Sequence, residues 1–418
     1  MTLKDVAVVG AAMTRFGKYL DRSLKDLTRE AVQAALDSAG MDKSVPQVAV
    51  VGNAAAGLST GQECIRAQVV LRDMGIEEIP MINTENACAS SSTAFHLAWL
   101  YVASGMYDVA LAVGMEKTYN PDKARMFAAF SAGTDVELLQ QTMASLQADL
   151  AKKDRDGAPG GEGGGQSGGA GKSRSMFMDI YASGTRAHMR RYGTTKEQFA
   201  KVAVKNHFFG SLNPHAQYRE RYTVEEILNS PLVAEPLTRL MCAPTGDGAS
   251  AAILVSAEKA RQYTTKPVWV RGSALGSGKD MKPGMPNITA RVARKAFEMA
   301  GMGTEDMDVM EVHDATAPAE VFIYEDLELC PRGEGGRLID EGVTELGGRV
   351  PVNTSGGLLS KGHPVGATGV AQIYEIFLQL RGEAGERQVQ GAKVGLCHNG
   401  GGMVRGEAAA TCVHILSL

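Results

Sequence analysis

The chain has 418 residues, of which 44% are hydrophobic and 22% charged, and its formal net charge at pH 7 is -4. This length and composition predict a globular protein with enough chain for two domains or more. The slightly acidic balance argues against a nucleic-acid partner, and no stretch of about 18 apolar residues predicts a membrane span. Because the N-terminus lacks a basic stretch followed by an apolar one, we expect a cytoplasmic protein that is not bound to membranes.

The first 118 residues alternate between segments typical of strands and of helices. Short β-branched runs predict buried strands at 6–10, 48–51 and 109–114. The spacing of apolar residues predicts helices at 31–41 and 95–102. This alternation indicates an α/β unit.

A cysteine, Cys88, stands at the head of the second of these helices, before a run of serines. A thiol in that position faces unpaired backbone N–H groups and the positive end of the helix dipole, which favour the thiolate. A lone cysteine is more often a small buried hydrophobe, so other residues must support a reactive role. The six cysteines form no C-x-x-C pair, and neither a zinc site nor a disulfide framework is indicated.

The middle of the chain, about 119–241, has a different composition. Glycine dominates 157–171, which cannot bury apolar surface and is expected to be a solvated excursion. Its end, Gly171-Lys172-Ser173, lacks the first glycine of a phosphate-binding loop. The segments 176–192 and 196–207 are predicted to be helical and to form a lid over a cleft.

The last third repeats the pattern of the first. Ala39-Gly40-Met41 before one strand recurs as Ala300-Gly301-Met302 before another, and Ile82-Asn83-Thr84 recurs as Val352-Asn353-Thr354. The matching apolar runs lie at 268–272, 309–312 and 393–396. We therefore predict a duplicated α/β unit, with a mostly parallel central sheet in each half.

Three segments of this last third carry reactive side chains. His313 follows a predicted strand, at the edge where open α/β sheets commonly bind ligands, and His363 lies in the turn Gly362-His363-Pro364. Cys397 precedes His398, Asn399 and three glycines, Gly400 to Gly402, whose backbone N–H groups are available to a ligand. Each of these residues alone is as often structural as catalytic.

Together these segments resemble the thiolase family, in the same order and over essentially the whole chain. The resemblance implies a duplicated thiolase-like fold of two α/β halves with mixed central sheets and an inserted loop domain. Its implied boundaries are an N-terminal half over 1–118, completed by about 242–264, a loop domain over 119–241 and a C-terminal half over 265–418. The pair His398-Asn399 is similar to the archaeal and sterol-carrier-type branch.

The resemblance also implies an activity: CoA-dependent cleavage of a β-ketoacyl-CoA, or the reverse condensation, through an acyl group on Cys88. His363 would take the thiol proton, and a second thiol would protonate the enolate of the leaving acyl-CoA. In that branch this thiol follows His-Asp, where this chain has Ala315, so Cys397 is expected to serve. Aligning the glycines would instead put His398 there, and both assignments stay open.

Oxyanion stabilisation is expected from His313 and His363 at one site. At the other, the backbone N–H of Cys88 would act with that of Gly400 or Gly401, beside Asn399. CoA enters as a substrate, and no metal or other cofactor is implied. The resemblance implies a homodimeric core, with a small zinc-ribbon and OB-fold subunit as a further partner.

Three other activities are compatible with these motifs. A ketoacyl or hydroxymethylglutaryl-CoA synthase shares the fold and the nucleophilic cysteine, but Pro364 and Cys397 favour a thiolase. A sterol-carrier-type aldolase usually lacks the cysteine, and an inactive thiolase-like scaffold would bind another subunit without acylation. Acetoacetyl-CoA thiolases and benzoylsuccinyl-CoA thiolase of aromatic degradation are both candidate types within the branch.

Overall fold

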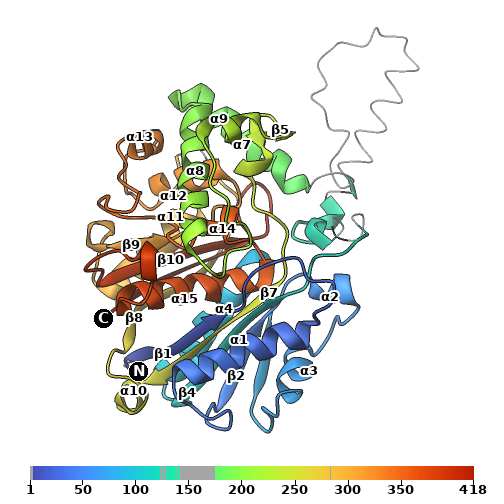
Figure 1. The fold of residues 1–418 in the computed structure, drawn as a ribbon, viewed down its shortest axis with the longest axis vertical. Coiled ribbons are helices and arrows are strands. Elements are labelled where there is room, and N and C mark those ends of the chain that lie inside the picture. The colour runs from blue at the N-terminus through green and yellow to red at the C-terminus, as the bar shows by residue number, and fades with distance from the viewer. Residues whose placement is uncertain (1–2, 123–125, 127–128, 139, 142–174, 283) are drawn as a thin grey trace.

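The computed structural model describes residues 3–122, 126, 129–138, 140–141, 175–282 and 284–418 (Figure 1). The glycine-rich segment 157–171 lies outside these residues. None of the described helices is long and apolar enough to cross a membrane.

A single sheet runs through the molecule, with strand order β3-β2-β4-β7-β1-β8-β11-β10-β9. Its first five members belong to the N-terminal half: β3 (Met81–Thr84), β2 (Val48–Gly52), β4 (Val109–Glu116), β7 (Gly248–Ser256) and β1 (Val6–Met13). The other four belong to the C-terminal half: β8 (Val268–Ser277), β11 (Ala410–Ser417), β10 (Val394–Gly401) and β9 (Val309–Glu311). All the strands expected from β-branched runs are confirmed.

The two halves of the sheet have the same pairing pattern. In the first, β2 pairs in parallel with β3 and β4, whereas β7 is antiparallel to both β4 and β1. In the second, β9 and β10 are parallel, and β11 is antiparallel to both β10 and β8. One strand in each half therefore runs against the others, β7 in the first and β11 in the second. The sheets are mixed, as the thiolase resemblance implied, and most strands of each half point the same way, as the sequence predicted.

The fifth strand of the C-terminal half is reduced to one residue. Val352 makes a single parallel bridge to Met310 of β9, in the place where β3 pairs with β2 in the first half. Asn353 follows with a positive φ of 61°, which turns the chain away from the sheet edge. The predicted correspondence between Ile82-Asn83-Thr84 and Val352-Asn353-Thr354 thus holds in space.

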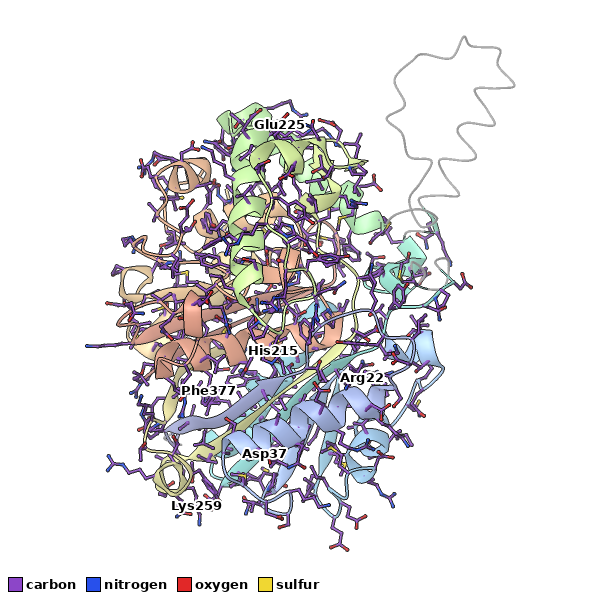
Figure 2. All side chains as sticks on the ribbon, viewed as in Figure 1. Arg22, Asp37, His215, Glu225, Lys259 and Phe377 are labelled. Carbon is purple, nitrogen blue, oxygen red and sulfur yellow. The ribbon has the colours of Figure 1, made fainter. Side chains whose placement is uncertain are left out.

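Helices cover both outer faces and fill the space between the halves (Figure 1). One outer face carries α1 (Leu24–Ser38), with α3 (Arg66–Arg72) and α10 (Ala257–Tyr263) beside it, and the other carries α11 (Ile288–Ala300) and α12 (Ala317–Asp326). Between the halves lie α4 (Ser90–Ala103) and α15 (Thr368–Arg381), which contact each other. Phe377, labelled in Figure 2, belongs to this central layer.

The ends of these helices follow from local sequence. Ser23 and Asp26 form a capping box at the start of α1, and Asn287 caps α11, which ends at Gly301 in the left-handed conformation. The helix α4 has no capping side chain and is almost wholly apolar after its serines. Its position therefore depends on burial between the two halves of the sheet.

The middle of the chain forms a cap over the C-terminal half. The predicted helices are confirmed as α7 (Met176–Tyr192) and α8 (Lys196–Leu212), which are followed by α9 (Val224–Asn229) and the hairpin of β5 (Leu232–Ala234) and β6 (Leu237–Thr238). Both α7 and α8 contact α12. The chain returns to the sheet through 242–247, where Cys242 bridges Thr316 and Thr245 bridges His363.

Candidate active site

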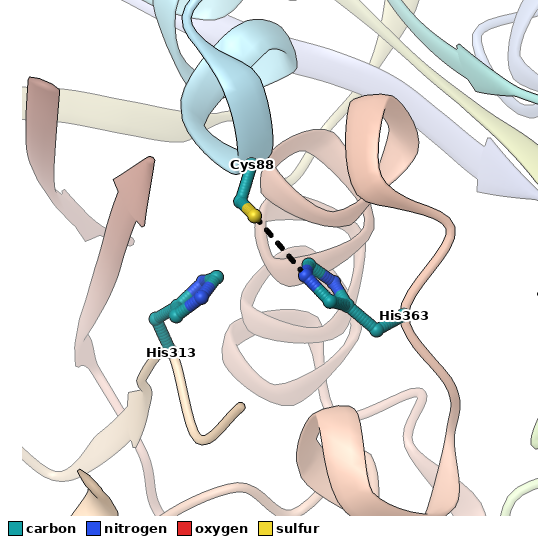
Figure 3. A group of neighbouring side chains, drawn as sticks. All are labelled: Cys88, His313 and His363. Atoms are coloured by element: carbon teal, nitrogen blue, oxygen red, sulfur yellow. Dashed lines mark hydrogen bonds between the residues drawn. The ribbon is translucent and has the colours of Figure 1, made fainter. Parts of the chain in front are cut away.

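Three reactive side chains from distant parts of the chain meet beside the head of α4 (Figure 3). Cys88 lies in the 3-10 turn Ala87–Ala89 immediately before that helix. Its Sγ is 3.3 Å from Nε2 of His363. The His313 ring packs edge-on against the His363 ring, with 5.2 Å between centroids, and ligand atoms of all three side chains lie within 4.8 Å of one another.

The turn that holds Cys88 depends on close backbone contacts. Ala87 has a positive φ of 48°, and a side chain at Gly401 would collide with the Asn86 carbonyl and the Ala89 amide. On the other side, a side chain at Gly52 would lie 2.6 Å from the Ser90 carbonyl. Strands β2 and β10 can therefore approach the nucleophile turn only because both residues are glycines.

The tautomer of His363 follows from its second hydrogen bond. Its Nδ1 is 2.8 Å from Oγ1 of Thr368, and that hydroxyl donates its own hydrogen to the carbonyl of Pro364 at 3.0 Å. The hydroxyl oxygen must therefore accept from Nδ1–H, which leaves the lone pair of Nε2 directed at Cys88. His363 is thus oriented as a base toward the thiol, and Thr368 had no assigned role from sequence.

The thiol and the imidazole are both neutral at rest. Burial, and then the negative charge of Glu116, raise the pKa of Cys88 to about 12, against the backbone N–H groups of Gly402 and Cys88 that lower it. Burial, with the neighbouring His313 and Lys361, lowers the pKa of His363 well below its usual value. The helix N-terminus, which was expected to favour the thiolate, is therefore outweighed by burial.

A buried carboxylate, Glu116 at the end of β4, holds the segment after His363. Its oxygens accept backbone N–H groups of Ala54, Ala55 and Gly366, at 3.3, 3.1 and 2.9 Å. Burial raises the pKa of Glu116, whereas these N–H groups lower it. The sequence motifs did not predict a role for Glu116, although a glutamate at the end of an apolar strand could have indicated one.

Cys397, the second thiol expected from sequence, is not part of the group formed by Cys88, His313 and His363. Cys397 is fully buried in β10 opposite His414 and belongs to the central hydrophobic cluster with Phe95 and Ile373. It lies four residues before Gly401, which is roughly 13 Å along an extended strand. Its role as an acid/base thiol stays a prediction, and this apolar environment does not favour it.

The residues after Cys397 have distinct partners. His398 is 3.1 Å from Thr289 Oγ1 on α11, and its pKa falls to about 3, mainly by burial and then by the nearby His313. Asn399 donates to Oε1 of Gln372 on α15 at 3.2 Å. Gly400 and Gly401 pair with β11 as part of the strand. The amide that faces the Cys88 sulfur is that of Gly402, where the chain leaves the strand with φ 63°.

His313 is neutral as well, since burial lowers its pKa to about 4. The carboxylate of the next residue, Asp314, has other partners: it accepts hydrogen bonds from the amide of Leu358 at 2.7 Å and from the Nδ2 group of Asn206 at 2.8 Å. Leu358 lies in the short helix Gly357–Ser360, just before His363. Asp314 therefore ties the segments of the two active-site histidines together.

The same three atoms could also hold a metal ion, because a cysteine sulfur and two imidazole nitrogens are ligands that Zn²⁺ accepts. All six cysteines are free. In the described residues the Cys88 sulfur is engaged by His363, which is the arrangement of an activated nucleophile and its base.

Comparisons with known proteins agree with the geometry. Residues 6–155 match the model "Thiolase, N-terminal domain", and residues 273–417 match "Thiolase C-terminal domain-like". An acetyl-CoA acetyltransferase of Methanothermobacter thermautotrophicus is 40% identical over 99% of this chain and 100% of its own. Sterol carrier protein 2 of Rattus norvegicus is 36% identical over 95% of this chain and 70% of its own.

Solved structures have the same fold. The Ltp2-ChsH2(DUF35) aldolase superposes with a TM-score of 0.76 at 24% identity, covering 100% of this chain and 98% of its own. Human mitochondrial 3-ketoacyl-CoA thiolase gives a TM-score of 0.69 at 18% identity, covering 100% and 99%.

Proposed function

This chain belongs to the thiolase family of acyltransferases, and we propose that it cleaves a β-ketoacyl-CoA with CoA, or runs the reverse condensation, through an acyl thioester on Cys88. The observation that carries the proposal is the Cys88 Sγ to His363 Nε2 contact of 3.3 Å at the head of a buried helix. A neutral thiol hydrogen-bonded to a neutral imidazole becomes nucleophilic when the base removes its proton during attack.

The proposed reaction has two stages. In the first, His363 takes the proton of Cys88, the sulfur attacks the keto carbon, and the bond between the α and β carbons breaks to give an enolate of the shorter acyl-CoA. In the second, a CoA thiolate attacks the acyl-Cys88 thioester and releases the second acyl-CoA. Burial suits both stages, since it excludes water that would hydrolyse the thioester.

Oxyanion stabilisation is assigned to donors around the sulfur. The backbone N–H groups of Cys88 and Gly402 already interact with the Cys88 sulfur, so an oxygen on the carbon bonded to it would lie near the same donors. We assign the enolate oxygen to His313 and His363, whose rings face one another beside the nucleophile. The supporting role of Asn399, Gly400 and Gly401 is to hold this end of β10 in place.

CoA is the substrate that the mechanism requires, and the mechanism uses no metal or redox cofactor. We propose a homodimeric core with a small zinc-ribbon and OB-fold subunit, since one similar structure is titled as a complex with a DUF35 protein. Acetoacetyl-CoA is the first substrate to test, because a relative of 40% identity is named acetyl-CoA acetyltransferase.

The test is a screen of β-ketoacyl-CoA esters, beginning with acetoacetyl-CoA and benzoylsuccinyl-CoA, with and without a co-purified small subunit. We expect CoA-dependent cleavage and a mass increase on the Cys88 peptide equal to one acyl group. Acylation without any cleavage or condensation would contradict the thiolase assignment, and no acylation by any ester would favour a non-catalytic scaffold.

A further inference from the structure

The proposed reaction needs a group that protonates the α-carbon of the leaving enolate, and neither thiol position expected from sequence supplies one beside Cys88. Position 315 is alanine, and Cys397 is packed among apolar side chains in the central layer. Within β10, successive side chains point to opposite faces, and His398 is directed at Thr289 on the outer helix α11. Cys397 and His398 both stay predictions for this role, and a further candidate lies on another element.

The helix α7 lies over the site and is anchored at both ends. Near its C-terminal end, His188 is 3.0 Å from Glu325 and stacks on Phe322, both on α12. At its N-terminal end, the Phe177 ring packs against Gly133. The carbonyl of Gly133 accepts the amide of Met403 at 2.9 Å.

This contact leads directly to the nucleophile. A side chain at Gly402, which precedes Met403, would meet the carbonyl of Gly133 and the side chain of Ala87. The N–H of Gly402 faces the sulfur of Cys88. The residue that the start of α7 contacts, Gly133, is therefore a direct neighbour of the glycine turn beside Cys88.

Tyr181 stands one helical turn after Phe177, so its side chain leaves α7 on the same face. That face continues through the buried residues Ala182 and Thr185 to His188. Burial raises the pKa of Tyr181, and negative charge on Cys88 or on Asp314 raises it further. Tyr181 thus shares the face of α7 whose first residue contacts Gly133 beside the glycine turn, and charge on Cys88 or Asp314 acts on its phenol. The phenol carries its proton at neutral pH.

We propose that the Tyr181 hydroxyl is the catalytic acid/base for the α-carbon, in place of the second thiol of other thiolases; this inference rests on the proposed function. In the forward direction the O–H proton passes to the α-carbon of the enolate, which leaves a phenolate. The phenolate then takes the S–H proton of incoming CoA, and the CoA thiolate attacks acyl-Cys88. Both proton transfers are downhill, since an enolate is a stronger base than a phenolate and a phenolate is a stronger base than a thiolate. The Cys88 thiolate that leaves takes back the proton held by His363.

The experiment compares wild type with Tyr181→Phe, and uses Tyr192→Phe, at the far end of the same helix, as the matched control. Three rates are measured: acylation of Cys88 by acetyl-CoA, CoA-dependent cleavage of the β-ketoacyl-CoA esters screened above, and deuterium uptake from D2O into the α-carbon of acetyl-CoA. Thermal melting checks the fold of each variant.

For Tyr181→Phe we expect cleavage and deuterium uptake to fall by about 10²- to 10³-fold. Acylation by acetyl-CoA should fall by less than about tenfold, because the CoA thiolate that leaves in that step is a weak base and can depart without being protonated. Tyr192→Phe should match wild type in all three. Cleavage by Tyr181→Phe within about threefold of wild type, or an equal loss of acylation and cleavage, would overturn the role of Tyr181 and leave the proposed function intact. A wild type that neither acylates nor cleaves would overturn the proposed function, and this inference with it.

Discussion

In both halves of the molecule a short 3-10 turn precedes the central helix. The reactive side chain at or before this turn differs between the halves. In the N-terminal half, the 3-10 turn Ala87–Ala89 leads into α4 and carries Cys88, the proposed nucleophile. In the C-terminal half, the 3-10 turn Val365–Ala367 leads into α15, and His363, the proposed base, stands two residues before it. Duplication has brought two helix N-termini to one place, and divergence of their turns has produced a reactive pair there.

The two turns are also held differently. Backbone packing positions Cys88, since the glycines of β2 and β10 admit its turn closely and no side chain caps α4. Side chains position His363, through Thr368 on its ring and Glu116 on the amide of Gly366. A nucleophile needs a fixed place, whereas a base also needs one tautomer, which the hydroxyl of Thr368 selects for His363.

The largest effect on turnover is expected from a substitution at the turn that carries Cys88. Cys88→Ser should lower turnover by at least about 10³-fold, because a serine hydroxyl is a poor nucleophile beside a base whose pKa lies below its usual value. The melting temperature should stay close to that of wild type, since oxygen replaces sulfur at similar volume. Retention of more than about a tenth of the activity would contradict the role of Cys88.

Near the turn that precedes α15, we expect His363→Gln and Thr368→Val to lower the rate of Cys88 acylation by different amounts. His363→Gln should lower acylation of Cys88 by about 10²-fold or more, because general-base assistance is lost. Thr368→Val should cost less, since the imidazole remains but loses the hydroxyl that selects its tautomer. Stopped-flow measurement of acyl-enzyme formation ranks the two variants, and an equal rate for Thr368→Val and wild type would show that the tautomer needs no such partner.

The neutral state of the pair predicts a pH dependence. Alkylation of Cys88 by iodoacetamide should rise by about tenfold per pH unit between pH 7 and pH 9, because the thiolate fraction grows in this range when the pKa is about 12. Peptide-level mass spectrometry separates Cys88 from the exposed Cys64. A rate that is already constant above pH 7 would instead indicate a resting thiolate paired with an imidazolium.

Periodicity and repeated motifs were sufficient to predict two matching α/β halves, because strand and helix segments leave local patterns that recur in the same order along the chain. The order of the strands within the sheet depends on tertiary pairing and was not predicted. The same sequence could not predict which amide faces Cys88, since Gly400 and Gly401 are committed to β11 and only Gly402 leaves the strand. Tyr181 was missed for a similar reason. Its role depends on where α7 lies over the sheet, and no local pattern encodes the contact between Phe177 and Gly133.

The resting pKa of Cys88 shows a second limit of local reasoning. The helix N-terminus is visible in the sequence and favours a thiolate, but the larger opposing effects are burial and the charge of Glu116. Both arise from tertiary packing, since Glu116 lies at the end of β4, far from Cys88 in the chain. Local sequence therefore predicts Cys88 as the nucleophile without predicting its protonation state.

The smallest expected effect compares the two asparagines that the duplication relates, Asn83 and Asn353. Asn353 is fully buried: its Oδ1 accepts the amide of Val312 at 2.8 Å, and its Nδ2 donates to Glu320 at 2.6 Å. Asn83 is exposed and makes the equivalent bonds to the amide of Ala67 and to Gln68 at 2.8 and 3.0 Å.

We expect Asn353→Ala to lower the free energy of unfolding by about 3 kcal/mol, because it leaves the buried amide of Val312 without its partner, removes one hydrogen bond to the buried Glu320 and puts alanine at a positive φ. Asn83→Ala should cost about 1 kcal/mol, since water can replace its exposed bonds. Urea denaturation followed by circular dichroism gives both values. Equal losses for the two variants would mean that the buried network of the C-terminal half adds no stability beyond that of the simpler edge strand in the N-terminal half.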